Sequence, residues 1–90
     1  MKKPEQFPVK VVLPLTFYKD HLSRGCGSTA EIVGQNKKFI TVILDEEAWI
    51  DIYSDADFYI SFIKTEDYSE NKSIVDSAVR TMAKLEMAVA

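Results

Sequence analysis

The chain has 90 residues, of which 47% are hydrophobic, and a formal net charge of −3 at pH 7. This length suits a single domain over residues 1–90, with residues 1–7 expected to be a frayed N-terminal lead-in. The acidic balance disfavours binding to nucleic-acid backbones or to anionic membranes. The single cysteine excludes an internal disulfide and fits a reducing compartment. Without a signal-peptide core or an apolar run of membrane-spanning length, a cytoplasmic location is the default expectation.

The first predicted elements are a strand and a short helix. Alternating apolar residues predict a strand over 9–15, in which Pro14 marks either an edge position or the end of the strand. Thr16 is expected to cap a helix that continues to about Arg24 and stops at Gly25. The expected apolar anchors of this helix are Phe17, Tyr18 and Leu22.

Two further strands are predicted, over 30–33 and 39–44, with a turn at 34–37 between them. The second strand reads Phe-Ile-Thr-Val-Ile-Leu and is apolar on both faces except at Thr41. Such a β-branched, two-sided apolar run is typical of a central strand.

Two long helices are predicted to complete the chain. Asp45 is a favourable N-cap for the first, which is expected to continue to about Lys64. After a polar turn, Ser69 or Ser73 is expected to cap the second. The element order is therefore β-α-β-β-α-α, which predicts an α+β domain. We expect a small, mainly antiparallel three-stranded sheet with the two long helices packed on it.

The first long helix carries apolar residues on two sides. Trp49 lies on the main apolar stripe, and we expect it to be buried against the sheet. Phe58 and Phe62 lie instead among acidic and serine residues, where a solvated helix would carry charged side chains. Either the last helix covers these two rings, or another molecule does. The last helix has its own apolar seam, formed by Val75, Ala78, Met82, Leu85 and Val89.

These features favour a non-enzymatic binding or oligomerisation module that acts through its two long amphipathic helices. The expected partner is a second copy of the chain or another protein, and most simply a homodimer with a two-fold interface. The candidate interface residues are Phe58, Phe62, Met82 and Leu85. No cofactor or metal is expected, no membrane is expected as a partner, and a small-molecule ligand is left open.

An alternative is a small enzyme centred on His21, with Arg24 holding an anion and Asp20 or Cys26 assisting. Adjacent side chains on a helix diverge by about 100°, so Asp20 is poorly placed to orient His21. The simpler interpretation is a surface helix whose His and Arg pair with local carboxylates.

A third alternative is a nucleic-acid-associated, acidic mimic or regulatory protein. Lys37 and Lys38 at the predicted turn are the only basic pair besides Lys2 and Lys3, so a nucleic-acid site is disfavoured. The carboxylates of Glu47, Asp51 and Asp55 recur every four residues and could instead form an acidic recognition surface or hold a cation. A solvated helix face is the simpler interpretation of these three residues.

Overall fold

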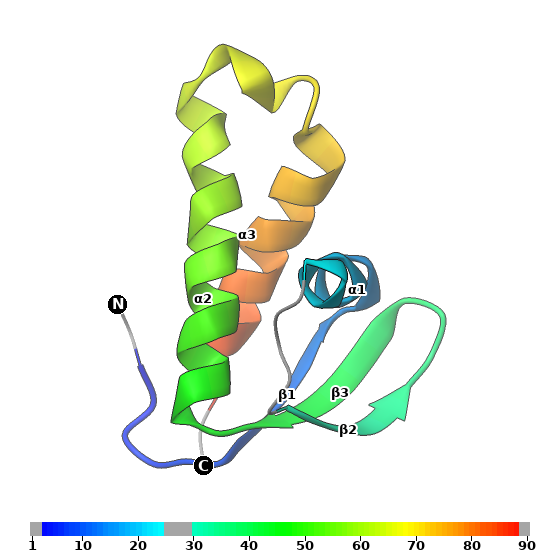
Figure 1. Ribbon diagram of the computed structural model, residues 1–90, viewed down its shortest axis with the longest axis vertical. Coiled ribbons are helices and arrows are strands. Elements are labelled where there is room, and N and C mark those ends of the chain that lie inside the picture. Colours follow the sequence, from blue (N-terminus) through cyan, green and yellow to red (C-terminus); the bar gives the residue numbers. More distant parts are fainter. Residues whose placement is uncertain (1–2, 25–29, 89–90) are drawn as a thin grey trace.

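The computed structural model describes residues 3–24 and 30–88 of the chain. A three-stranded antiparallel sheet of strand order β1-β3-β2 lies at one end of the molecule, and a pair of long helices extends away from it (Figure 1). The strands are β1 (Val9–Pro14), β2 (Glu31–Gln35) and β3 (Phe39–Leu44). The helices are α1 (Leu15–Ser23), α2 (Glu46–Ile60) and α3 (Lys72–Met87), with short 3-10 turns η1 (Ser61–Lys64) and η2 (Glu66–Tyr68) before α3. The predicted α+β class and element order are confirmed.

One face of the sheet forms the core and the other is open. β3 is central, as predicted, and pairs with β1 so that Val11 lies opposite Val42 and Val12 lies opposite Thr41. Because side chains alternate along a strand, these two pairs point to opposite faces. The face of Val11 and Val42 is buried in one cluster with residues of all three helices. The opposite face is only partly covered, and Phe39 on it is 40% exposed.

The start of α1 and the turn after β2 differ from the prediction. Pro14, not Thr16, is the N-cap of α1, and the helix has no side-chain cap. The predicted cap is wrong because the helix begins two residues earlier, where the amide of Leu15 donates to the carbonyl of Lys38 at 2.9 Å. β2 extends beyond the predicted strand, and the following turn is stabilised by Asn36 Oδ1, which accepts from two main-chain amides.

Helix α2 begins as predicted. Asp45 is its N-cap, and Asp45 Oδ1 accepts a hydrogen bond from the amide of Ala48 at 2.8 Å. The α-helix ends at Ile60, and a 3-10 turn carries the helical direction on to Lys64. The predicted cap of α3 is wrong: Asn71 occupies the N-cap position, and neither Ser69 nor Ser73 does so.

Replacing Asp45 by alanine should lower the free energy of unfolding by about 1 kcal/mol, because one amide at the start of α2 loses its acceptor. Urea denaturation measures this change. Glu47→Ala in the same first turn is the control and should have a smaller effect, since Glu47 is not the capping residue. Equal losses in the two variants would contradict the assignment of Asp45 as the cap.

Trp49 joins the two long helices inside the core. Its side chain is fully buried, as predicted, and its Nε1 donates to the carbonyl of Leu85 at 3.0 Å. The indole stacks on Tyr53 with ring centroids 4.9 Å apart and meets the edge of Phe7 at 6.5 Å. On the seam of α3, the side chains of Val75, Ala78 and Leu85 are buried and Met82 is half-buried, whereas Val89 lies outside the described residues.

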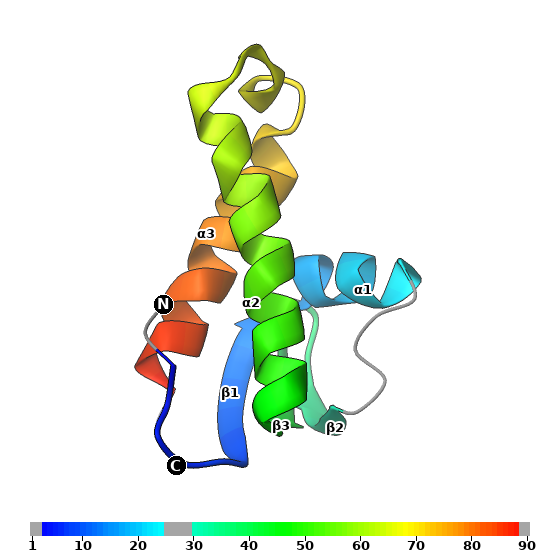
Figure 2. The same ribbon diagram turned by 60° about the vertical axis from the view of Figure 1, so that its left-hand side comes forward.

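Helices α2 and α3 form an antiparallel hairpin whose far end extends beyond the sheet and α1. Figure 2 shows α1 on one side of this hairpin, close to the sheet, with the η1–η2 connection at the opposite end. In the described part of the chain, no helix combines the length and apolar character needed to cross a membrane. The far end of this helical hairpin (46–87) extends beyond α1, and most residues of its connecting segment are exposed.

Candidate functional site

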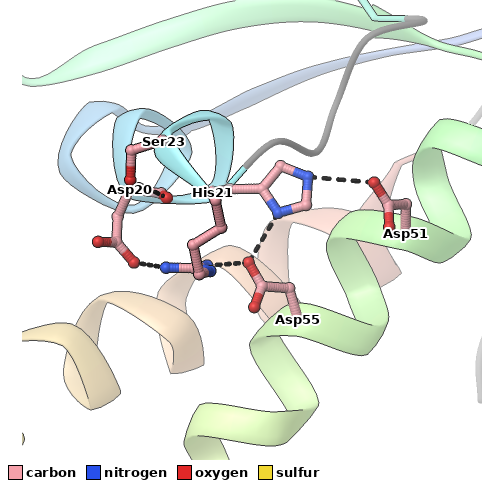
Figure 3. Close-up of polar contacts among 6 residues, drawn as sticks. Asp20, His21, Ser23, Asp51 and Asp55 are labelled. Carbon is pink, nitrogen blue, oxygen red and sulfur yellow. Dashed lines mark hydrogen bonds and ion pairs between the residues drawn. The ribbon is translucent and has the colours of Figure 1, made fainter.

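A polar cluster joins α1 to α2, and His21 is its centre. The imidazole ring is fully buried and points from α1 towards two carboxylates of α2 (Figure 3). His21 Nδ1 lies 2.7 Å from Asp55 Oδ2, and Nε2 lies 3.4 Å from Asp51 Oδ2. The interpretation of His21 as a surface residue is therefore wrong. His21 also takes the inward position for which Leu22 was predicted, while Leu22 is exposed.

Arg24 completes the same cluster from the end of α1. Its guanidinium pairs with Asp55 and with Asp20, and it lies 5.0 Å from the centre of the Tyr59 ring. Asp55 thus accepts from both His21 and Arg24. Asp20 pairs with Arg24 and not with His21, in line with the expectation that neighbouring positions on a helix are poorly placed to pair.

The geometry of the cluster suits a clamp between helices. Nδ1 of the imidazole is within hydrogen-bond distance of Asp55, and Nε2 faces Asp51 without a hydrogen bond. The ring has no solvent-exposed surface through which a reacting group could reach it.

The three carboxylates considered as a cation site do not act together. Asp51 and Asp55 contact His21, whereas Glu47 is exposed. Among residues 3–24 and 30–88, no group of three or more His, Cys, Asp or Glu side chains could hold a metal ion. Cys26 lies outside the described residues.

The second candidate site is the aromatic cluster, formed by Phe58, Tyr59 and Phe62 on the helical hairpin. The three rings meet edge to face, with centroids between 5.3 and 5.7 Å apart. Phe58 nevertheless remains 58% exposed, and Phe62 is half-buried. The last helix does not cover Phe58, so that alternative is wrong for this ring.

The other candidate interface residues differ in how exposed they are. Leu85 is fully buried inside the domain, which makes its side chain part of the core and not of a surface. Met82 is half-buried on α3. Val79 and Met87 are 43% and 74% exposed, although the sequence interpretation did not single them out. With Ala83 they recur every four residues, and this spacing was the available signal for an exposed apolar strip.

A smaller charged group lies at the start of α3. The carboxylate of Asp76 accepts from Lys72 Nζ at 2.9 Å and from the Tyr68 hydroxyl at 3.0 Å. The hydrogen bond from Lys72, followed by that from Tyr68, lowers the pKa of Asp76 below its ordinary value, and the same contact raises the pKa of Lys72. Because the pKa of Asp76 is depressed on folding, its contribution to stability is present above its unfolded pKa and is lost as the pH falls through its folded pKa.

Lys72→Met should therefore raise the pKa of Asp76 towards its ordinary value, because the largest stabiliser of the carboxylate is removed. A carboxyl NMR titration of Asp76 measures this change. Lys84→Met removes a charge elsewhere on the same helix and should leave the titration of Asp76 nearly unchanged. If the two variants titrate alike, the contact between Lys72 and Asp76 is not formed in solution.

Comparison with known proteins gives no relative for this chain. No protein-family model matches the sequence, and no match is found among curated proteins or solved structures. Function is therefore inferred from the two sites described above, the buried polar cluster and the exposed aromatic cluster.

Proposed function

We propose that the protein is a non-enzymatic module that binds a second copy of itself through its helical hairpin. The observation that carries this proposal is the exposure of Phe58. Phe58 is 58% exposed, and its ring packs edge to face on two other rings. An exposed aromatic ring that is held in place by its neighbours is suited to bind an apolar surface of another molecule. Aromatic anchors of this kind supply much of the energy of protein interfaces.

The position of the aromatic cluster also supports binding through the hairpin. Tyr59 packs against Phe17 and Arg24 of α1, whereas Phe58 and Phe62 lie at the end of α2 and in η1, where the hairpin extends beyond the sheet (Figure 1). Ile63 in η1 adds exposed apolar surface at this end. A protruding pair of amphipathic helices is most simply covered by a second pair, which gives a four-helix bundle and a closed two-fold dimer.

The alternative of an enzyme centred on His21 gains little support from the geometry. The ring is enclosed by α1 and α2, and its two nitrogens face Asp51 and Asp55. A general base must reach the proton that it removes, so a fully buried ring whose Nδ1 is hydrogen-bonded to Asp55 suits a structural role better. Lys37 and Lys38 are exposed near the turn after β2, but two lysines make a weak nucleic-acid site.

The proposal is tested by replacing Phe58 with glutamate and measuring the dissociation constant of the dimer by sedimentation across a dilution series. Burying a carboxylate in place of the ring should weaken self-association by about tenfold or more. Phe39→Glu is the matched control, since Phe39 is 40% exposed and lies on the open sheet face away from the hairpin. The control should associate like the wild type.

Two results would contradict the proposal. A wild-type chain that stays monomeric would remove self-association as its activity. If only Phe39→Glu weakened self-association, the contact would lie on the sheet and not on the helical hairpin.

A further inference from the structure

The exposed aromatic cluster and the buried polar cluster lie on the same side of α2. At 100° per residue, Phe58 is within about 60° of both Asp51 and Asp55, the two carboxylates that face α1. Asp55 and Tyr59 are four residues apart, so their side chains are neighbours on one face of the helix. The aromatic cluster therefore lies directly beside the contact between α1 and α2.

Tyr59 is the ring that joins the aromatic cluster to α1. It packs edge to face with Phe58 and Phe62, at centroid distances of 5.3 and 5.7 Å. It also packs edge to face with Phe17 of α1 at 6.3 Å, and the guanidinium of Arg24 lies 5.0 Å from its centre. Phe17 is fully buried and belongs to the closely packed core. Tyr59 is therefore held from α1 while it supports the two outer rings.

Two carboxylates hold Arg24 against this ring. The guanidinium pairs with Asp20 one turn earlier on α1, and with Asp55 on α2. Asp55 also accepts from Nδ1 of the buried His21 at 2.7 Å, so its own position is fixed by the core. A cation over an aromatic face attracts the ring electrostatically. The polar cluster thus fixes the guanidinium, and the guanidinium helps to fix Tyr59.

This chain of contacts affects binding because exposed side chains lose conformational freedom when an interface forms. Ordering a side chain has an entropic cost, and a ring that is already held in its bound orientation avoids part of it. Phe58 is 58% exposed, so the two rings that it touches do much to set its orientation. Loosening Tyr59 would leave Phe58 and Phe62 free to take other rotamers.

We propose that Arg24 is a positioning residue of the self-association site. It holds Tyr59 from α1, and through this ring it keeps Phe58 and Phe62 in the arrangement that a second copy of the chain contacts. The second copy then approaches the hairpin from the side of α1, where both clusters lie. This inference rests on the proposed self-association and adds the end of α1 to its binding site.

The test measures the dissociation constant of Arg24→Met by sedimentation across a dilution series. The substitution removes the guanidinium and keeps a long, unbranched side chain. Self-association should weaken about three- to tenfold, because one or two aromatic side chains must then be ordered on binding. Arg80→Met is the matched control, since it removes the same charge from an exposed position on α3. The control should associate like the wild type.

A double-mutant cycle with Phe58→Ala separates positioning from a general loosening of the fold. If Arg24 acts through the ring of Phe58, Arg24→Met should have a smaller effect on association in the Phe58→Ala chain than in the wild type. A variant that only loosens the fold would weaken association by the same factor in both backgrounds. Circular dichroism establishes that each variant is folded. If Arg24→Met does not fold, Tyr59→Leu takes its place in the cycle, because it interrupts the same chain of contacts.

Three results would overturn the positioning role of Arg24. They are wild-type affinity in the cycle variant, an equal loss in the Arg80→Met control, and an equal loss in the two backgrounds of the cycle. If Phe58→Glu still weakens the dimer in those cases, self-association stands and only the role of Arg24 is wrong. A monomeric wild type would instead remove the proposed function itself.

Discussion

Trp49→Ala should lower the free energy of unfolding by about 3–5 kcal/mol, which is a large part of the stability of a domain of this size. The indole is fully buried, stacks on Tyr53 and meets Phe7 at its edge. Its removal leaves a cavity where α2 and α3 meet and also leaves the Leu85 carbonyl without the indole N–H. Both losses act on the contact that joins the two long helices.

Urea denaturation followed by circular dichroism measures this change without relying on tryptophan fluorescence. Phe39→Ala is the control, because Phe39 is an aromatic residue on the open face of the sheet and its truncation leaves no comparable cavity. We expect the control to lose far less stability than Trp49→Ala. A Trp49→Ala protein that unfolds at nearly the wild-type urea concentration would contradict the packing of α2 on α3.

Asp55→Ala should destabilise the fold by about 2–4 kcal/mol, because His21 and Arg24 both lose the carboxylate that they share as a hydrogen-bond acceptor. Asp55 accepts from His21 Nδ1 inside the core and from Arg24 at its edge. His21 is fully buried and cannot replace the lost carboxylate with water. The side chain of Arg24 is 30% exposed and can recover part of its hydration, which moderates the loss.

The matched control for Asp55→Ala is Asp57→Ala, which removes an exposed carboxylate two residues further along α2. Substitutions of this kind on the surface usually change the free energy of unfolding by less than about 0.5 kcal/mol. Thermal and urea denaturation, measured on dilute protein, compare the two variants. Equal stability of Asp55→Ala and Asp57→Ala would show that the polar cluster does not hold α1 on α2.

The main elements could be predicted because each depends on local sequence. Asp45 caps α2 by accepting from the amide of Ala48, only three residues further along the chain. Trp49 lies on the apolar stripe that repeats every 3.6 residues and faces the core. The central position of β3 followed from its two-sided apolar pattern. Thr16 and Ser73 were wrong as caps because they are only suitable by residue type, and the tertiary structure placed other residues at the helix starts.

The polar cluster could not be predicted from neighbouring residues. His21 meets Asp51 and Asp55 across at least thirty positions of sequence, so no local pattern links them. The same limit applies to Leu85, which has the periodicity of an interface seam but is buried in the core of the domain. Phe58 is the reverse case, because an aromatic residue among acidic and serine residues of one helix face is a local pattern.

The mass of the wild-type protein in solution tests the central claim most directly. Sedimentation equilibrium across the micromolar concentration range gives this mass without any substitution or label. Self-association through the helical hairpin predicts a mass that approaches twice the 10.2 kDa of the chain as the concentration rises. A mass that stays at 10.2 kDa throughout would contradict self-association and leave Phe58 as an exposed residue of a monomer.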